Sequence, residues 1–290
     1  MAQTTTTTLA TTIPAELITK WIQMEARPFN IVAPLVFNDI LPQGQGVVYV
    51  MNKMPTTSAA SVAEASDITS TARTTTDASI TVAEVGLGTA LTDLAKETSR
   101  IDGQIEKWSK SQGRAVAQKL TGDLCGLFAA LNSGTGVGST NVNITVANFL
   151  EAWYTLMNAN APGLPRTVLH PRQVIDLFSV VSASTGTPFA ALTELVAKGK
   201  LPGGLPSAGF AGELFGIPVY STSEVDTANR AADRVGAMFV ETAMGLITLR
   251  PVTTEIDRDA SARETEIITT AVYGVGELND TYGVSIVTDA

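Results

Sequence analysis

The stretch KMPTTSAASVAEASDITSTARTTTDAS, residues 53–79, is unusually poor in side chains that could form a core. Ser, Thr and Ala fill 18 of its 27 positions, and its large apolar side chains are Met54, Val62 and Ile68. Ordering a backbone residue costs about 1–2 kcal/mol, which such a segment cannot recover by folding on itself. Either this segment is disordered, or another chain orders it.

Apolar, strand-like runs flank this poor segment on both sides. VVYVM precedes it at residues 47–51, and ITVAEVGL follows it at residues 80–87. This profile is typical of a long arm rather than a linker, because a linker does not need strand-forming ends. An arm that a neighbouring chain orders indicates an assembly.

Composition limits the classes of function. The chain has 290 residues and a mass of 30.3 kDa, which permits one large domain or two modest ones. Its hydrophobic content of 44% allows a substantial core. The net charge is −9 and no basic patch is visible, so binding to nucleic acid by neutralising phosphates is not expected.

The cysteine content and the N-terminal sequence give expectations about location. Cys125 is the only cysteine, which excludes disulfides within the chain and fits a reducing compartment. The opening MAQTTTTTLATT lacks the basic start and apolar core of a signal peptide. No run approaches the roughly 18 apolar residues of a membrane span. We therefore expect a soluble, cytosolic product.

Two helices are expected in the first half of the chain. A short one near Pro14 carries one apolar face, which has no partner nearby in sequence. It must dock on something distant or on a neighbouring chain. A long helical pattern runs from about Asp93 to Leu131, weakened locally by Gly103 and Gly113.

The second half reads as a compact α/β region followed by strands. The α/β region covers about 141–240, and in it Thr145 caps an amphipathic helix at 146–157. RTVLHP at 166–171 reads as a strand that meets a helix. Three apolar, β-branched runs within 245–290 predict strands, the first two separated by a densely charged turn.

The two residues best suited to nucleophilic chemistry have simpler structural interpretations. His170 is the lone histidine and stands just before a helix, whereas Cys125 falls on the apolar face of the long helix. A hydrolytic triad needs a nucleophile, a base and an orienting acid, and the G-x-S-x-G elbow is absent. We interpret His170 as a strand-end histidine and Cys125 as a small buried hydrophobe.

Other patterns also give no catalytic or ligand site. The GxGxG formed by Gly134, Gly136 and Gly138 follows a helix rather than a strand, so it reads as a turn. One His and one Cys cannot build a zinc site. The acidic residues lack the spacing of a catalytic pair or a calcium loop, and the charged turn reads as solvated or as an interface; those considered are Asp77, Glu84, Asp257, Asp259 and Glu264. We expect no enzyme activity, cofactor or metal.

The order of these parts resembles the major capsid protein of tailed bacteriophages, with the Hong Kong 97 type fold. The resemblance runs from about residue 13 to the end and rests on part order and short motifs. The segments that carry it are IPAELITKWIQMEARPFNIVAPLVF, the Ala63-Glu64 pair in SVAEAS, LTDLAKETSRID before the long helix, VLHPRQVIDLF, LFGIPVYSTSEV and AVYGVGELNDTYGVSIVTDA.

The resemblance implies an α+β fold with an N-arm, an extended β-hairpin loop, a long spine helix, a peripheral domain and an axial domain. Residues 1–42 would form the N-terminal arm and 43–92 the extended loop. The peripheral domain would combine 93–140 with 241–290, and the axial domain would occupy 141–240.

The resemblance also implies the partners. Such proteins form pentamers and hexamers that close into an icosahedral shell around double-stranded DNA, in a virion capsid assembled in the host cytoplasm. A portal protein would be a partner. The chain starts directly at the N-arm without a long charged prefix, so a scaffolding or decoration protein would be a separate chain. DNA would be enclosed without sequence-specific binding, and no membrane is involved.

We expect six side chains to lie at subunit interfaces: Trp21, Phe29, Lys53, Glu64, Arg258 and Arg263. The two aromatic residues of the N-arm would dock on a neighbour or on the spine helix. The lysine is the only one in the extended loop, and no motif identifies a residue to which it would be crosslinked. The two arginines of the charged turn would form salt bridges across a junction between capsomers.

Two alternatives remain open at this point. An encapsulin-like nanocompartment shell would have the same fold but would hold an enzyme cargo. A soluble hydrolase that uses His170 or Cys125 belongs to a different class and would be a monomer of about 30 kDa with measurable turnover.

Overall fold

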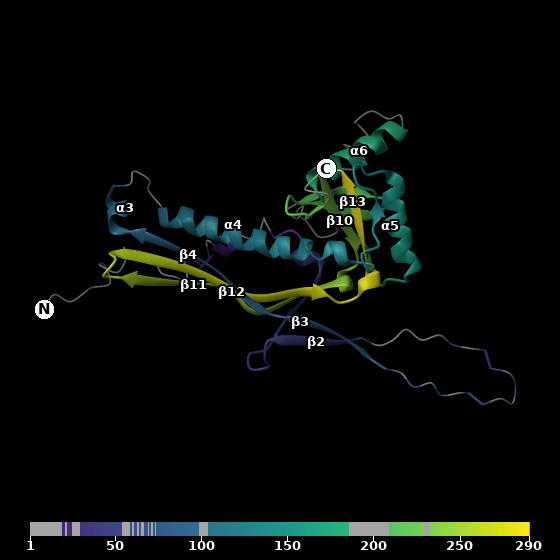
Figure 1. Ribbon diagram of the computed structural model, residues 1–290, viewed down its shortest axis with the longest axis horizontal. Helices are drawn as coiled ribbons and strands as arrows, with labels where there is room; N and C mark the ends of the chain where they lie inside the picture. The colour runs from purple at the N-terminus through teal and green to yellow at the C-terminus, as the bar shows by residue number, and fades with distance from the viewer. Residues whose placement is uncertain are drawn as a thin grey trace.

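The computed structural model describes most of the chain in long continuous ranges. These are residues 19–20, 22–24, 30–53, 74–98, 104–185, 209–228 and 232–289, together with 59, 61–62, 64, 67–68, 70 and 72. The molecule is elongated, with a long sheet and a long helix at one end and a second sheet covered by helices at the other (Figure 1).

A four-stranded sheet forms the long part of the molecule, in the order β1-β11-β12-β4. Its centre is the long hairpin of β11 (Met244–Asp259) and β12 (Glu264–Glu277), flanked by β1 (Phe37–Ile40) and β4 (Ala83–Thr92). The outer strand β1 runs parallel to β11, whereas the other pairings are antiparallel. Val, Ile and Thr dominate these strands, as expected for residues that pack on a pleated surface.

The long helix α4 (Gln104–Cys125) runs along this sheet (Figure 1). Gln112, only 2% exposed, ties the two together. Its Nε2 donates to Thr89 Oγ1 at 2.8 Å, and its Oε1 accepts from Thr269 Oγ1 at 2.8 Å. Because a buried amide without partners would destabilise the fold, this pairing fixes the position of the helix over β4 and β12.

A second, mixed sheet contains the order β5-β13-β10-β6-β8-β7, with β9 paired to β10. Two helices, α5 (Val146–Asn158) and α6 (Pro171–Thr185), accompany it (Figure 1). Its strands are β5 (Val137–Gly138), β6 (Arg166–Leu169), β7 (Phe210–Leu214), β8 (Ile217–Ser221), β9 (Thr227–Ala228), β10 (Asp233–Phe239) and β13 (Gly283–Asp289).

A two-stranded hairpin and several short helices complete the described chain. The hairpin joins β2 (Val48–Lys53) to β3 (Thr76–Thr81) and projects below the long sheet (Figure 1). The short helices are η2 (Ala33–Leu35), α3 (Asp93–Thr98), η3 (Phe128–Ala130), η5 (Glu241–Ala243) and η6 (Asp280–Tyr282).

Three apolar clusters form the core of the part of the chain that is described. The largest joins the end of α4 and η3 to both sheets, through residues such as Leu124, Phe128 and Phe239. A second lies between α5, α6 and the mixed sheet. The third, around Leu41, Ile80 and Leu278, lies where the hairpin meets the four-stranded sheet.

Several predicted elements are confirmed. Thr145 caps α5, accepting a hydrogen bond from Asn148 N at 3.2 Å, and α6 begins at Pro171 directly after β6. The three predicted C-terminal strands are present as β11, β12 and β13. The helix expected near Pro14 is described only at residues 19–20 and 22–24, which are helical.

The prediction of one helix from 93 to 131 was wrong. Residues 93–98 form the separate α3, and α4 ends at Cys125 before the 3₁₀ turn η3. At the C-terminal end, Gly126 is the first residue outside the helix and Leu127 N bonds to Leu124 O, three residues back. Glycine weakens a helix by about 1 kcal/mol relative to alanine, which favours the end of the helix at this point. The apolar periodicity of the sequence continues beyond it, and for this reason the predicted helix was too long.

Two strands pair with other sheets than the expected boundaries of the extended loop and the peripheral domain imply. β4, expected within the extended loop, pairs with β12 from Thr92 to Ala83, so the free hairpin comprises only β2 and β3. β13, expected beside the other C-terminal strands, pairs along its length with β10 of the mixed sheet. The corner between β12 and β13, at η6, therefore carries the chain from one sheet to the other.

Candidate subunit-interaction surfaces

The root of the hairpin is held in a socket lined by glycines. Ile80 of β3 is 1% exposed and packs against Gly245, Gly274 and Gly276 of the neighbouring strands. A Cβ at Gly276 would lie 2.7 Å from Ile80 Cγ1, and one at Gly274 would lie 2.5 Å from Thr81 O. Both distances are too short for a side chain, so the absence of side chains lets β3 approach the sheet closely.

Two hydrogen bonds fasten the hairpin at the same end. Tyr49 donates its hydroxyl proton to Asp39 Oδ2 at 2.6 Å, and Val82 N donates to Val47 O at 2.9 Å. The Tyr49 hydrogen bond lowers the pKa of Asp39, and the same bond raises the pKa of Tyr49. The hairpin therefore leaves the body of the chain in a defined direction.

The outer face of the hairpin is apolar but exposed. Along β2, Tyr49 and Met51 turn toward the core while Val48 and Val50 turn outward, with 44% and 53% of their surfaces exposed. Their cross-strand partners are Thr81 and Ser79. Within the described chain β2 and β3 pair only with each other, so each strand also offers an open edge.

Helix α5 presents a second exposed apolar surface. Leu150, Tyr154 and Met157 recur at helical spacing, and the last two are 67% and 60% exposed. The opposite face of the same helix, with Phe149, Ala152 and Leu156, is buried in the core. An exposed apolar stripe on an otherwise well-packed helix is a feature of surfaces that contact another chain.

The far tip of the four-stranded sheet is rich in charge. Arg258 Nη2 lies 2.5 Å from Asp93 Oδ2 of the same chain, and Asp93 N donates to Arg263 O at 2.9 Å. Arg263 is exposed and has a positive φ of 56°. Arg258 is therefore paired inside its own chain, while the predicted contact of both arginines with a neighbouring capsomer stays a prediction.

The N-arm crosses α4 at a glycine. A Cβ at Gly113 would lie 2.4 Å from Ile22 O, and Ile22 itself is fully buried. Gln23 Nε2 reaches Val252 O of β11 at 3.4 Å. Trp21 and Phe29, the aromatic residues expected to dock nearby, lie outside the described residues.

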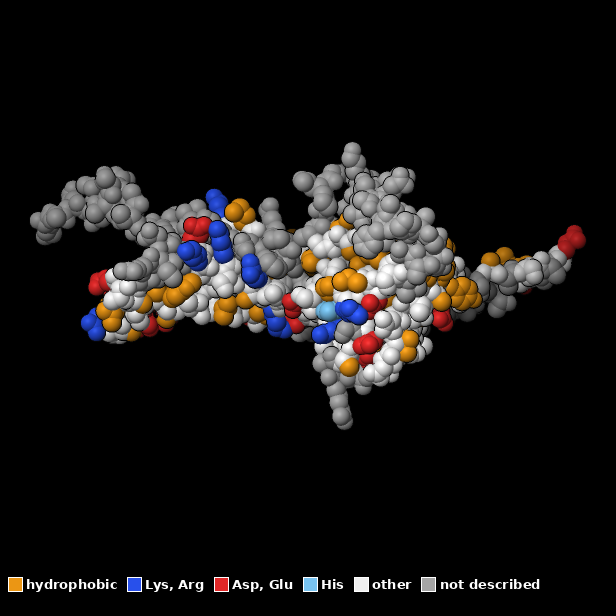
Figure 2. Space-filling model, turned by 90° about the horizontal axis from the view of Figure 1, so that it is seen from above, with side chains coloured by type: hydrophobic (Ala, Val, Ile, Leu, Met, Phe, Trp, Pro, Cys, Tyr) orange, Lys and Arg blue, Asp and Glu red, His pale blue; other side chains and the backbone are white. Residues whose placement is uncertain are grey.

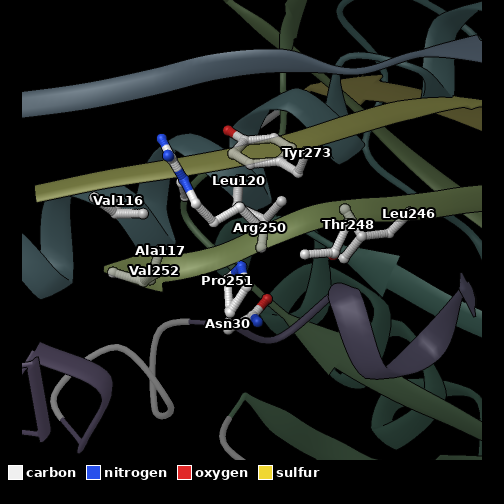
Figure 3. A pocket seen from close by; sticks show the side chains of 11 residues that line it. Asn30, Val116, Ala117, Leu120, Leu246, Thr248, Arg250, Pro251, Val252 and Tyr273 are labelled. Atoms are coloured by element: carbon white, nitrogen blue, oxygen red, sulfur yellow. The ribbon is translucent and has the colours of Figure 1, made fainter. Parts of the chain in front are cut away.

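An apolar cavity of about 240 Å³ lies beside this crossing, between α4 and β11. Figure 3 shows Val116, Ala117 and Leu120 on the helix side and Arg250 and Val252 on the strand. Asn30 lies at its lower edge, and its buried Oδ1 has no hydrogen-bond partner. The cavity lacks a group of ionisable residues suited to catalysis.

Basic residues of α4 gather on an exposed face of the helix. Lys107, Arg114 and Lys119 are exposed, and basic side chains follow one another over this part of the molecule (Figure 2). Lys110 pairs with Glu106 at 2.7 Å, and Lys119 pairs with Asp123. These i,i+4 pairs offset part of the positive charge of the helix.

The two residues considered for nucleophilic catalysis, Cys125 and His170, are positioned as parts of the folded core and its edge rather than as a catalytic pair. Cys125 is fully buried, and burial, with the nearby acidic residues Glu224 and Asp226, raises the pKa of its thiol to about 12. It is therefore a protonated core residue and not a thiolate nucleophile. Burial also lowers the pKa of His170, whose Nδ1 accepts from Arg172 N at 3.3 Å.

The predicted glycine turn is present only in part: Gly134, with a φ of 72°, lies in a turn after η3, whereas Gly138, with a φ of 99°, ends strand β5. The charged turn between β11 and β12 is present at residues 260–263, while Asp257, Asp259 and Glu264 lie in the strands themselves. Asp259 Oδ1 accepts hydrogen bonds from the amides of Ser261 and Ala262, which closes the β11–β12 turn. No group of three metal-binding side chains occurs in the part of the chain that is described. The described helices include none long and apolar enough to cross a membrane.

The remaining predicted contact residues lie on the hairpin and its distal segment. Glu64 is exposed. Lys53 ends β2 on the face turned toward the sheet and acts electrostatically on Glu277. Sequence reasoning missed Glu277 and Asp280, and also the glycine socket. The glycines at alternate positions 274 and 276 were the available signal, because a strand interior disfavours glycine unless another backbone approaches.

Comparison with known proteins identifies the fold. No protein-family model and no curated protein matches the sequence. The Cyanophage Pam1 capsid matches with a TM-score of 0.64 and 15% identity over 89% of this chain and 92% of that one. The Cyanophage P-SCSP1u capsid matches with a TM-score of 0.62 and 13% identity, covering 88% and 86%. An encapsulin complex from Synechococcus elongatus matches with a TM-score of 0.60 and 11% identity, covering 99% and 91%.

These likenesses extend over nearly the whole chain and establish the fold. The protein has the α+β, Hong Kong 97-like fold of phage capsids, which confirms the fold class expected from the motifs.

Proposed function

We propose that this chain is the major capsid protein of a tailed phage. It assembles as pentamers and hexamers into an icosahedral shell that encloses double-stranded DNA. The observation that carries the proposal is the match of almost the entire chain to several phage capsid structures at TM-scores of 0.57–0.64. The role is structural rather than catalytic, in keeping with the protonated thiol of Cys125.

The exposed surfaces support self-association. The outward valines of the hairpin and the stripe on α5 lie on different parts of the chain, so one copy can use one surface against another surface of the next copy. Such head-to-tail contacts close into rings when the rotation between copies allows it. The division into arm, extended loop and two domains that we propose is the one given by the resemblance, adjusted at two strands: β4 goes with the four-stranded sheet and β13 with the mixed sheet.

The acidic charge supports enclosure of DNA without tight binding. With a net charge of −9, the chain has an excess of acidic side chains, which repel the phosphates of DNA. A portal protein and a separate scaffolding or decoration protein are the further partners we propose, in a virion assembled in the host cytoplasm.

Electron microscopy of the purified full-length chain, alone and with a scaffolding protein encoded beside its gene, tests this function. We expect closed particles of megadalton mass with fivefold and sixfold capsomers. A chain that stays a 30.3 kDa monomer under both conditions, with hydrolytic turnover that depends on His170 or Cys125, would contradict the proposal.

An encapsulin-like shell is the second candidate, because the encapsulin match covers 99% of this chain. The contents of particles isolated from the native source separate the two. Nuclease-protected double-stranded DNA supports the capsid, whereas an enriched enzyme cargo without DNA supports the nanocompartment.

A further inference from the structure

The cavity between α4 and β11 lies at an irregular stretch of the strand. The pairing of β11 with β12 shifts register between Thr248 and Arg250, and again between Arg250 and Thr253. Pro251 lies within this stretch, and its missing N–H group excludes it as a donor in the hydrogen-bond ladder. Such bulges bend a strand locally. The cavity of about 240 Å³ lies where this bulged stretch faces the helix (Figure 3).

Small side chains leave the cavity unfilled from both sides. Ala117 of α4 and Ala271 of β12 line it and are only 3% and 4% exposed. A close-packed core loses stability when it contains an empty space of this size. An apolar cavity of about 150 Å³ in another protein is known to hold benzene. The space beside α4 is therefore large enough for a substituted aromatic ring.

A buried hydrogen-bond acceptor without a partner belongs to the lining. Asn30 lines the cavity, and its buried Oδ1 accepts no hydrogen bond from the described part of the chain. The neighbouring polar groups have partners, because Tyr273 donates its hydroxyl proton to Asp123 at 2.9 Å and Arg250 pairs through Nη2 with Glu84. As a whole residue Asn30 is half-buried, so this edge of the cavity lies near the surface.

Water alone does not account for this space. A buried water needs about two to four polar partners, and apolar cavities stay dry. Most of the lining is aliphatic, from Val116 and Leu120 on the helix to Leu246 and Val252 on the strand. A single water would satisfy Asn30 Oδ1 but would leave the aliphatic part of the volume empty.

We propose that this cavity binds a small, neutral aromatic molecule that carries one hydroxyl group. The ring fills the aliphatic part between α4 and β11, and the hydroxyl donates its proton to Asn30 Oδ1. The ligand is uncharged, because Arg250 is already paired with Glu84 and burying a further charge is costly. Binding joins the helix to the strand beside the N-arm crossing, so it stabilises the folded chain increasingly as ligand concentration rises.

Isothermal titration calorimetry of the purified, unassembled full-length chain with 4-ethylphenol tests the proposal. We expect one site per chain with a Kd of about 0.1–1 mM. The compound 4-ethyltoluene has the same shape without the hydroxyl, and we expect it to bind about three- to tenfold more weakly, the usual contribution of one hydrogen bond. In Asn30→Leu this order should reverse, because the hydroxyl then has no acceptor and the more apolar compound is favoured.

Two further variants show where the compound binds. Ala117→Leu fills the cavity from the helix side and should weaken binding of 4-ethylphenol at least tenfold. Ile175→Ala is the control for binding to exposed apolar surface, because Ile175 lies on α6 with 60% of its surface exposed and does not line the cavity. We expect this variant to keep the affinity of the unaltered chain. Asn30→Leu remains informative if Ala117→Leu folds poorly.

Three outcomes would overturn the proposal. They are absence of binding to the unaltered chain, equal affinity for the two compounds, and an affinity for 4-ethylphenol that persists in Ala117→Leu. Binding to the unassembled chain that is lost in closed particles would also overturn it, because a side chain of a neighbouring copy would then fill the cavity. The titrations need only the folded chain, so their result does not depend on the proposed shell.

Discussion

Gly113 has a hydrogen atom where other residues have a side chain, and this lets the N-arm cross the long helix closely. A Cβ there would lie 2.4 Å from Ile22 O, whereas a Cβ at Gly122 of the same helix would meet nothing within 4 Å. Gly→Ala in a helix interior normally stabilises by about 1 kcal/mol. We therefore expect Gly122→Ala to raise the free energy of unfolding and Gly113→Ala to lower it by about 1–3 kcal/mol. Denaturant unfolding of both variants measures this, and equal stabilisation of both would show that the N-arm does not pack closely on α4.

Glu277 predicts the pH dependence of stability at the residue scale. Its pKa in the fold is about 7, above the ordinary 4.5, so the stability that it contributes is fully present below about pH 4.5 and is lost as pH rises through 7. Glu277→Gln stays neutral. We expect this variant to be more stable than the unaltered chain at pH 8 by about 1 kcal/mol, a value reduced for solvent screening, and similar at pH 4.5. Thermal unfolding at the two pH values measures the difference, and a constant difference would contradict it.

At the scale of elements, the cap of α5 shows how a local signal sets a boundary. Thr145 Oγ1 accepts from Asn148 N at 3.2 Å, while Thr155 Oγ1 in the same helix donates to Glu151 O and caps nothing. We expect Thr145→Ala to lower the free energy of unfolding by about 1 kcal/mol and Thr155→Ala to change it by less than about 0.5 kcal/mol. Chemical denaturation compares the two, and equal effects would argue against the cap.

At the scale of the whole molecule, the proposed function makes the hairpin a contact between one chain and the next. The double substitution Val48→Asp with Val50→Asp places two charges on its outward, exposed face. We expect the yield of closed particles to fall at least tenfold while the thermal unfolding of the unassembled chain is unchanged, because only an interface would bury these charges. Particle counts by electron microscopy measure the yield.

The matched control for this experiment is Val48→Thr with Val50→Thr. It keeps the side-chain shape and the strand preference while adding no charge. We expect particle yield close to that of the unaltered chain. Equal yields from the Asp and Thr pairs would show that this face of the hairpin does not lie in an interface.

Elements with strong local signals could be predicted from sequence. The Thr145 cap, Pro171 at the start of α6 and the alternating runs of β11 and β12 depend on neighbours within a few residues. The end of α4 was misjudged because apolar periodicity continues through η3 although hydrogen bonding tightens there. Such local signals report which conformation a segment prefers, but not where its hydrogen bonding stops.

The sequence by itself determined that residues 53–79 lack a core, that strands flank them and that the chain carries no conventional catalytic constellation. Only the tertiary structure decided that β4 pairs with β12, that β13 pairs with β10 and that Ile80 fits a glycine socket. The same is true of the hydrogen bonds that Ser133 donates to Asp280. The physical reason is that composition and periodicity reflect interactions within a few residues, whereas strand pairing and carboxyl pKa values depend on groups that folding brings together from distant parts of the chain.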